Sequence, residues 1–189
     1  MSAPQKTSAK RGAADLSDVL GSSVTDQKNQ YLTFLVNKEQ FAVGILAIKE
    51  IIEYGQQAMT SVPMMPKHIR GVINLRGRVV PVVDLAARFQ MASDDAGARA
   101  CIVIIEVSAG ETTMDIGVVV DAVDSVLEIR PSDIEPPPSF GAKIRTDFIS
   151  GMGKAETGFI ILLNANNVLS VEELAEMSGA TAAIAETAE

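Results

Sequence analysis

The chain contains one cysteine, one histidine and no tryptophan in 189 residues, and aromatic residues make up only 4% of it. The single cysteine, Cys101, cannot form a disulfide within the chain, and Cys101 and His68 are too few ligands for a structural zinc site. Apolar residues nevertheless amount to 47%. The composition therefore predicts a globular fold whose core consists mainly of Val, Ile, Leu and Met.

Positive charge is also scarce, because 16 Lys and Arg residues face 24 Asp and Glu residues and the formal net charge is −8. Nucleic-acid binding draws most of its affinity from basic side chains that neutralise phosphates, so this balance argues against it. We find no apolar run of signal-peptide length near the N-terminus and none long enough to cross a bilayer. We therefore expect a cytoplasmic protein.

The two ends of the chain differ in composition from its centre. Residues 1–28 are rich in Ser, Ala, Thr, Lys and Gln and have few large apolar side chains, which predicts a disordered arm. Residues 174–189 are mostly Ala, Thr and Glu, and we interpret them as the end of a C-terminal helix followed by an acidic tail. A folded domain of residues 29–173 remains between them.

Short apolar segments separated by polar turns dominate this central region and predict about ten β-strands. Their spacing is near ten residues and no long helices alternate with them, which favours small barrels over a doubly wound sheet. One of the ten, Ile48–Glu53, fits either a strand or a helical turn. The segments are Tyr31–Val36, Phe41–Ile45, Ile48–Glu53, Gly71–Leu75, Val79–Leu85, Cys101–Val107, Thr113–Val120, Val123–Ile129, Phe148–Met152 and Phe159–Leu163.

Four local signals add detail to this pattern. The sequence Leu75-Arg76-Gly77-Arg78 predicts a tight hairpin turn, with glycine where a positive φ is easiest. Pro81 lacks an amide proton, so we expect its strand to lie at a sheet edge or to carry a bulge. Asp84 is a candidate N-cap for a helical turn at Leu85–Phe89. The segment Asn164–Met177 predicts a closing helix.

No catalytic or cofactor-binding constellation is visible. We interpret His68 as a solvent-facing loop residue and Cys101 as a small buried apolar residue. The segment Gly151–Lys154 lacks the other residues of a phosphate-binding loop and is read as a turn. Four spread acids are read as a solvated face rather than a calcium site: Asp121, Asp124, Glu128 and Asp133. These patterns predict a binding module that is not an enzyme and holds no metal or cofactor.

One stretch departs from the acidic balance of the chain. Between Tyr54 and Val83 there is no acidic residue, whereas four cations are present: Lys67, Arg70, Arg76 and Arg78. Arg76 and Arg78 could be hydrated turn residues with no further role. Alternatively, an arginine at the turn could make a bidentate contact with a carboxylate of a partner. The sequence spacing leaves both readings open.

The run Val62-Pro63-Met64-Met65-Pro66-Lys67-His68-Ile69-Arg70-Gly71-Val72-Ile73-Asn74-Leu75-Arg76-Gly77-Arg78-Val79-Val80-Pro81-Val82-Val83-Asp84-Leu85 resembles the CheW family of bacterial chemotaxis coupling proteins. The resemblance extends to Tyr31–Glu53, Gly117–Asp121, Ile134–Pro138, Phe148–Lys154 and Phe159–Leu163. It covers roughly residues 29–173.

This resemblance implies a mainly β fold of two five-stranded SH3-like barrels packed on a shared hydrophobic seam, with short helices and a C-terminal helix. It implies a non-enzymatic adaptor that couples the cytoplasmic tips of methyl-accepting receptors to the regulatory domain of the histidine kinase CheA. It also implies a protein without cofactor, nucleic acid or inserted membrane segment, which we expect to be a monomer when free.

By the same resemblance, receptor-binding and kinase-binding residues can be assigned. The receptor-binding set is Ile45, Ile48, Glu50, Gly71, Arg76, Gly77, Ile102, Val103, Gly117, Val123 and Val126. The kinase-binding residues, on the first barrel, are Gly55, Thr60 and Val62. Glycines at strand edges would let a helix approach closely, although Ile102, Val103, Val123 and Val126 could simply fill the barrels.

A small-barrel module that binds oligonucleotides is the alternative function. Barrels of this size often hold single strands by stacking bases on aromatic rings. With two tyrosines, no tryptophan and a net negative charge, the sequence offers little for that purpose.

Overall fold

The computed structural model describes residues 27–91, 97–109, 111–137, 146–156, 158–169 and 173. Nearly all of the expected N-terminal arm and the whole of residues 174–189 lie outside this part of the chain, so both remain predictions. None of the helices among the described residues is both long and apolar enough to span a membrane.

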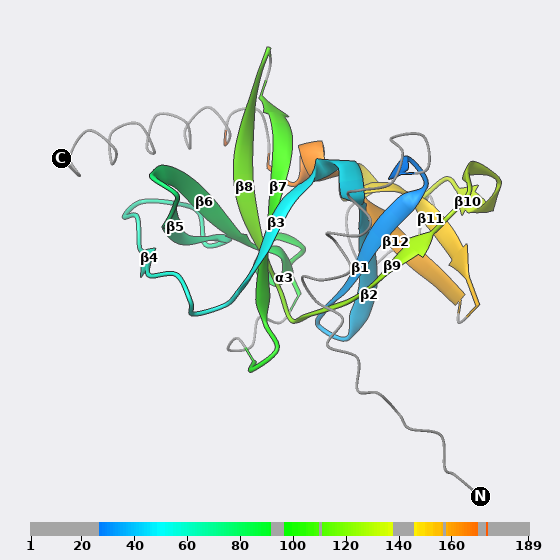
Figure 1. Ribbon diagram of the computed structural model, residues 1–189, viewed down its shortest axis with the longest axis horizontal. Helices are drawn as coiled ribbons and strands as arrows, with labels where there is room; N and C mark the ends of the chain where they lie inside the picture. The colour runs from blue at the N-terminus through cyan, green and yellow to red at the C-terminus, as the bar shows by residue number, and fades with distance from the viewer. Residues whose placement is uncertain are drawn as a thin grey trace, which may run out of the picture.

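The strands form two sheets that lie side by side (Figure 1). Sheet A has the order β10-β11-β12-β2-β1-β9, in which every neighbouring pair is antiparallel except β12 and β2. Its strands are β1 (Gln30–Val36), β2 (Glu39–Gly44), β9 (Ala122–Glu128), β10 (Ile134–Glu135), β11 (Ile149–Ala155) and β12 (Gly158–Leu163).

Sheet B has the order β3-β7-β8-β6-β5-β4, and its one parallel pair is β6 with β8. Its strands are β3 (Ile48–Glu53), β4 (Met59–Thr60), β5 (Ile69–Leu75), β6 (Arg78–Asp84), β7 (Cys101–Ala109) and β8 (Thr112–Val120). The helical turns are α3 (Leu85–Arg88) and the 3-10 turns η1 (Ile45–Ala47), η2 (Pro131–Asp133), η3 (Thr146–Phe148) and η4 (Ala165–Asn167).

This architecture confirms the predicted fold class. Each sheet has five strands of six residues or more and one strand of two residues, β10 or β4. The sheets curl in the manner of SH3-like barrels without closing. We refer to them as lobe A and lobe B.

The largest apolar cluster joins the two lobes. It contains Leu32 and Phe34 of sheet A, Val103 and Val118 of sheet B, and Leu169 from the end of the described chain. Four phenylalanine rings run through this seam in a row, with centroid separations of 6.3, 5.5 and 5.4 Å: Phe34, Phe41, Phe89 and Phe148. The core was predicted to be aliphatic, yet four of the six phenylalanines gather where the lobes meet.

Two of the local predictions are confirmed. The β5–β6 turn has Arg76 at φ 54° and Gly77 at φ 82°, which is the left-handed pair that a two-residue hairpin turn requires. Asp84 caps α3, because its carboxylate accepts a hydrogen bond from the backbone N–H of Ala87 at 3.2 Å. The ambiguous segment Ile48–Glu53 is a strand, β3.

Other local predictions were wrong. The segment Gly151–Lys154, which was expected to be a turn, lies within strand β11 and pairs with β12. Strand β6 lies inside sheet B between β5 and β8 rather than at the predicted edge. The alternative, a bulge, is met only on its partner strand: the β5–β6 register shifts between Ile69 and Gly71. Pro81 is tolerated there because it pairs with Val72 on β5 and lies one residue before the pairing with β8 begins at Val82.

The start of the closing helix also differs from the prediction. Asn164 caps the short 3-10 turn η4, so no α-helix begins there. Glu173 is helical, and the other residues of 170–177 lie outside the described part of the chain, so that part of the helix stays a prediction.

Candidate partner-binding surfaces

A row of opposite charges crosses one end of sheet B. Glu106 on β7 is the direct cross-strand partner of Asp115 on β8, and two carboxylates in such a pair repel each other. Lys49 on β3 lies 2.9 Å from Glu106, and Arg78 on β6 lies 3.2 Å from Asp115. The two cations therefore neutralise the acidic pair from the strands on either side.

Arg76 extends this row at the β5–β6 turn. Its guanidinium lies 3.2 Å from the carboxylate of Glu50 on β3, and its side chain is 79% exposed against 28% for Glu50. These residues border a cavity of about 210 Å³. We call it the charged groove; its lining is Lys49, Glu50, Leu75, Arg76, Arg78, Val80, Ile104 and Asp115.

The acid-free stretch of the sequence does not form a bare basic patch. Arg70 donates two hydrogen bonds to Asp84, at 2.9 and 2.8 Å, and a third to the hydroxyl of Tyr54 at 3.1 Å. Arg76 and Arg78 meet acids from β3 and β8. Strands β3 and β8, which are distant in the sequence, therefore supply the counter-charges of Arg76 and Arg78.

Most of the predicted apolar receptor-binding side chains lie in the protein interior. Ile45, Ile48 and Val103 belong to the seam cluster, and Ile102 belongs to a second cluster within lobe B. Val123 and Val126 on β9 are half-buried against the seam. Of the predicted set, the structure brings Glu50, Arg76 and Gly77 together at the charged groove.

The predicted glycines have separate structural reasons. A Cβ atom at Gly71 would overlap the backbone of Thr60, and one at Gly117 would lie 2.7 Å from Cγ2 of Ile102. Both positions are inside sheet B, so the expectation that these glycines lie at strand edges was wrong. Gly77 has open space around it and is needed for its φ of 82°.

The predicted kinase-binding residues lie on and beside the edge strand β4. Thr60 is exposed on β4, the edge strand, and Gly55 forms the turn after β3 with a φ of 92°. Val62 follows β4 and is half-buried. Gly71 is therefore closer to these residues than to the charged groove, because it packs against Thr60.

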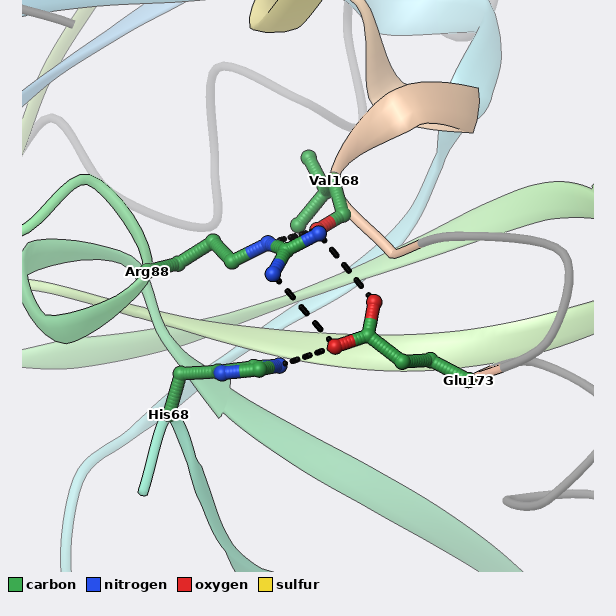
Figure 2. Close-up of polar contacts among 4 residues, drawn as sticks. All are labelled: His68, Arg88, Val168 and Glu173. Atoms are coloured by element: carbon green, nitrogen blue, oxygen red, sulfur yellow. Dashed lines mark hydrogen bonds and ion pairs between the residues drawn. The ribbon is translucent and has the colours of Figure 1, made fainter. Parts of the chain in front are cut away.

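His68 is not the solvent-facing residue that the sequence predicted. Its side chain is only 13% exposed, and its Nε2 lies 2.8 Å from Oε1 of Glu173 (Figure 2). The same carboxylate accepts hydrogen bonds from both terminal nitrogens of Arg88, at 3.3 and 3.1 Å. Burial lowers the pKa of His68 below 6.5, and Arg88 lowers it further, whereas Glu173 opposes the shift. No sequence signal links residues 105 positions apart.

Other predicted features are placed as follows. Cys101 opens β7 and is half-buried, and burial raises the pKa of its thiol. Asp121, Asp124, Glu128 and Asp133 are exposed, as expected of a solvated face. Among the described residues, no group of three His, Cys, Asp or Glu side chains could hold a metal ion.

Comparison with known proteins identifies the family. The family model for the CheW-like domain matches residues 30–173. The chain belongs to the CheW family. The chemotaxis protein CheW of Klebsiella aerogenes is 33% identical over 166 residues, which cover 87% of this chain and 93% of that protein. The CheW of Rhizobium meliloti is 32% identical over 150 residues, covering 79% and 93%.

A solved structure agrees with this assignment. The scaffolding protein TtCheW from Thermoanaerobacter tengcongensis superposes with a TM-score of 0.70 and 29% identity, over 77% of this chain and 95% of that one. CheW proteins are adaptors rather than enzymes. This family member is accordingly a chemotaxis adaptor. The charged groove and the β4 edge are candidate partner-binding surfaces.

Proposed function

We propose that this CheW-family adaptor couples the cytoplasmic tips of methyl-accepting receptors to the regulatory domain of CheA, in the cytoplasm and as a monomer when free. The charged groove contacts the receptor, and the β4–β5 edge of lobe B contacts the kinase. The observation that carries the proposal is the charged groove itself, in which an exposed arginine is held at a rigid turn beside paired charges of both signs.

The groove suits a helical partner whose surface carries polar and charged side chains. Arg76 uses one terminal nitrogen to reach Glu50, and its side chain remains largely exposed. An arginine held in this way can give a second, bidentate contact to a carboxylate on a partner. Leu75 and Val80 add apolar surface beside the charges.

The β4–β5 edge offers a different kind of surface. Among the described strands, β4 pairs with β5 alone, and an edge strand of this kind can make backbone contacts with a partner. The loop after it exposes Met64 fully, with a left-handed φ of 63°. An apolar side chain held on an edge loop suits a β-rich partner, and the family resemblance points to the CheA regulatory domain.

The proposal is tested with Arg76→Ala, titrated separately against a purified receptor cytoplasmic fragment and the CheA regulatory domain. Loss of a charge-assisted contact should weaken receptor binding by about 1–3 kcal/mol. Kinase affinity should be nearly unchanged, because Arg76 is in the β5–β6 turn, whereas β4 pairs with β5 only at Val72 and Ile73. Arg130→Ala is the matched control, since Arg130 is 74% exposed and lies 3.9 Å from Glu128, away from the groove.

Two results would reject this assignment. Receptor affinity equal to wild type for Arg76→Ala, with normal folding, would make Arg76 a hydrated turn residue. Equal loss of both affinities would show that the hairpin is needed for the fold or that the two surfaces overlap. Binding of single-stranded DNA in a parallel titration, with no binding of either protein, would favour the oligonucleotide alternative.

A further inference from the structure

The end of the described chain crosses from one lobe to the other. It leaves sheet A at Leu163, the last residue of β12, and continues through η4 to Val168 and Leu169. We call residues 164–169 together with Glu173 the C-terminal strap. Val168 and Leu169 are 1% and 2% exposed and belong to the apolar cluster that joins the lobes.

Three polar contacts attach the strap to lobe B. The backbone N–H of Ser108 on β7 donates to Oδ1 of Asn166 at 2.9 Å. Nε of Arg88 donates to the carbonyl oxygen of Val168 at 2.7 Å. Glu173 makes the third attachment, through Arg88 and His68 (Figure 2).

The third attachment is well sheltered. The side chains of Glu173, Arg88 and His68 are 18%, 19% and 13% exposed. Arg88 also lies over the ring of Phe148, 5.0 Å from its centroid. A bidentate arginine–carboxylate pair of this kind is stronger and more directional than an exposed ion pair. His68 directly precedes β5, and Arg88 lies in α3. The carboxylate of Glu173 therefore joins two points of lobe B to the strap.

We infer that Glu173 is an ionic lock that holds the C-terminal strap on lobe B and thereby fixes the lobes to each other. The apolar part of the strap is already tightly packed, since the cavity beside Val168 has a volume of only about 10 Å³. The lock keeps this packing closed at the seam. Neutralising Glu173 releases the strap from lobe B first at its end and then at Val168 and Asn166.

Hydrogen exchange of the full chain tests this lock, with Glu173→Gln as the variant and Glu172→Gln as a control of equal charge change. We expect Glu173→Gln to speed exchange roughly tenfold for the amides of Asn167 and Val168, as for loss of a hydrogen bond to a charged group. The Ser108 amide should follow, because its acceptor is on the strap. Glu172→Gln should leave all three amides at the wild-type rate.

The imidazole signals of His68 give a second readout, because His68 is the only histidine. Glu173→Gln should shift these signals, and Glu172→Gln should not. Unchanged His68 signals in Glu173→Gln would show that the contact is absent in solution. Unchanged exchange, or equal acceleration in both variants, would show that the strap does not depend on Glu173. Each of these results overturns the proposal without bearing on receptor or kinase binding.

Discussion

Gly71 on β5 packs directly against the backbone of Thr60 on β4 and leaves no room for a Cβ atom. Its φ of 152° lies outside the range that other residues adopt readily. Gly71→Ala should therefore lower the free energy of unfolding by about 2 kcal/mol or more, because β4 must move. Gly44→Ala is the control: it has open space and an ordinary φ of −58°. Urea melts that give both variants the same stability would contradict the prediction.

The acidic cross-strand pair should make Arg78 more important for stability than its exposure suggests. Arg78→Gln leaves Asp115 facing Glu106 without its counter-charge, and should destabilise the fold by up to about 1 kcal/mol. Asp115→Asn removes the repulsion, so Arg78→Gln should cost almost nothing in that background. The measurement is a double-mutant cycle by urea unfolding, and additive effects of the two changes would refute the charge argument.

Cys101 should react slowly with a thiol reagent in the native protein. Its side chain is half-buried, and burial raises the pKa of the thiol, so less of the reactive thiolate is present at neutral pH. Labelling should become fast in urea, where both effects are lost. Native labelling as fast as that of the unfolded chain would show that Cys101 is an accessible, activated thiol.

Stability should fall as the pH drops through the titration range of His68. The folded state lowers its pKa below 6.5, first by burial and then by Arg88, so the unfolded chain binds a proton more readily. The contribution is thus fully present above pH 6.5 and is lost as the pH falls through the folded pKa. His68→Gln should flatten the dependence of unfolding free energy on pH between about 7.5 and 5.5. Identical slopes for the two proteins would rule out this role of His68.

Local patterns in the sequence were sufficient for most of the longer strands, but not for the two-residue strands β4 and β10. Alternating apolar segments and polar turns predict most strands because each signal lies within ten neighbouring residues. The β5–β6 turn is an example, since Gly77 is the residue that its backbone requires. The N-cap at Asp84 is another, because the capping bond spans three residues. The charge balance likewise argued against a nucleic-acid binder, because Asp and Glu outnumber Lys and Arg.

Tertiary structure decided which of these residues are buried and which charges meet. Sequence order could not show that Arg76 and Arg78 meet Glu50 and Asp115, because β3 and β8 come close to the β5–β6 hairpin only in the folded lobe. The tertiary structure buried Ile102 within lobe B and Val103 in the seam between the lobes.

The same reason explains the errors. Pro81 predicted an edge strand or a bulge because proline has no amide proton to donate to a neighbouring strand. The parallel pairing of β6 with β8 begins only at Val82, one residue after Pro81, so no such proton is needed there. His68 was expected in solvent because its neighbours Pro66 and Lys67 are polar or turn-forming. Its burial results from Arg88 and Glu173, which arrive from α3 and from the far end of the chain. Short-range patterns determined the elements of this adaptor, and contacts between distant segments determined its surfaces.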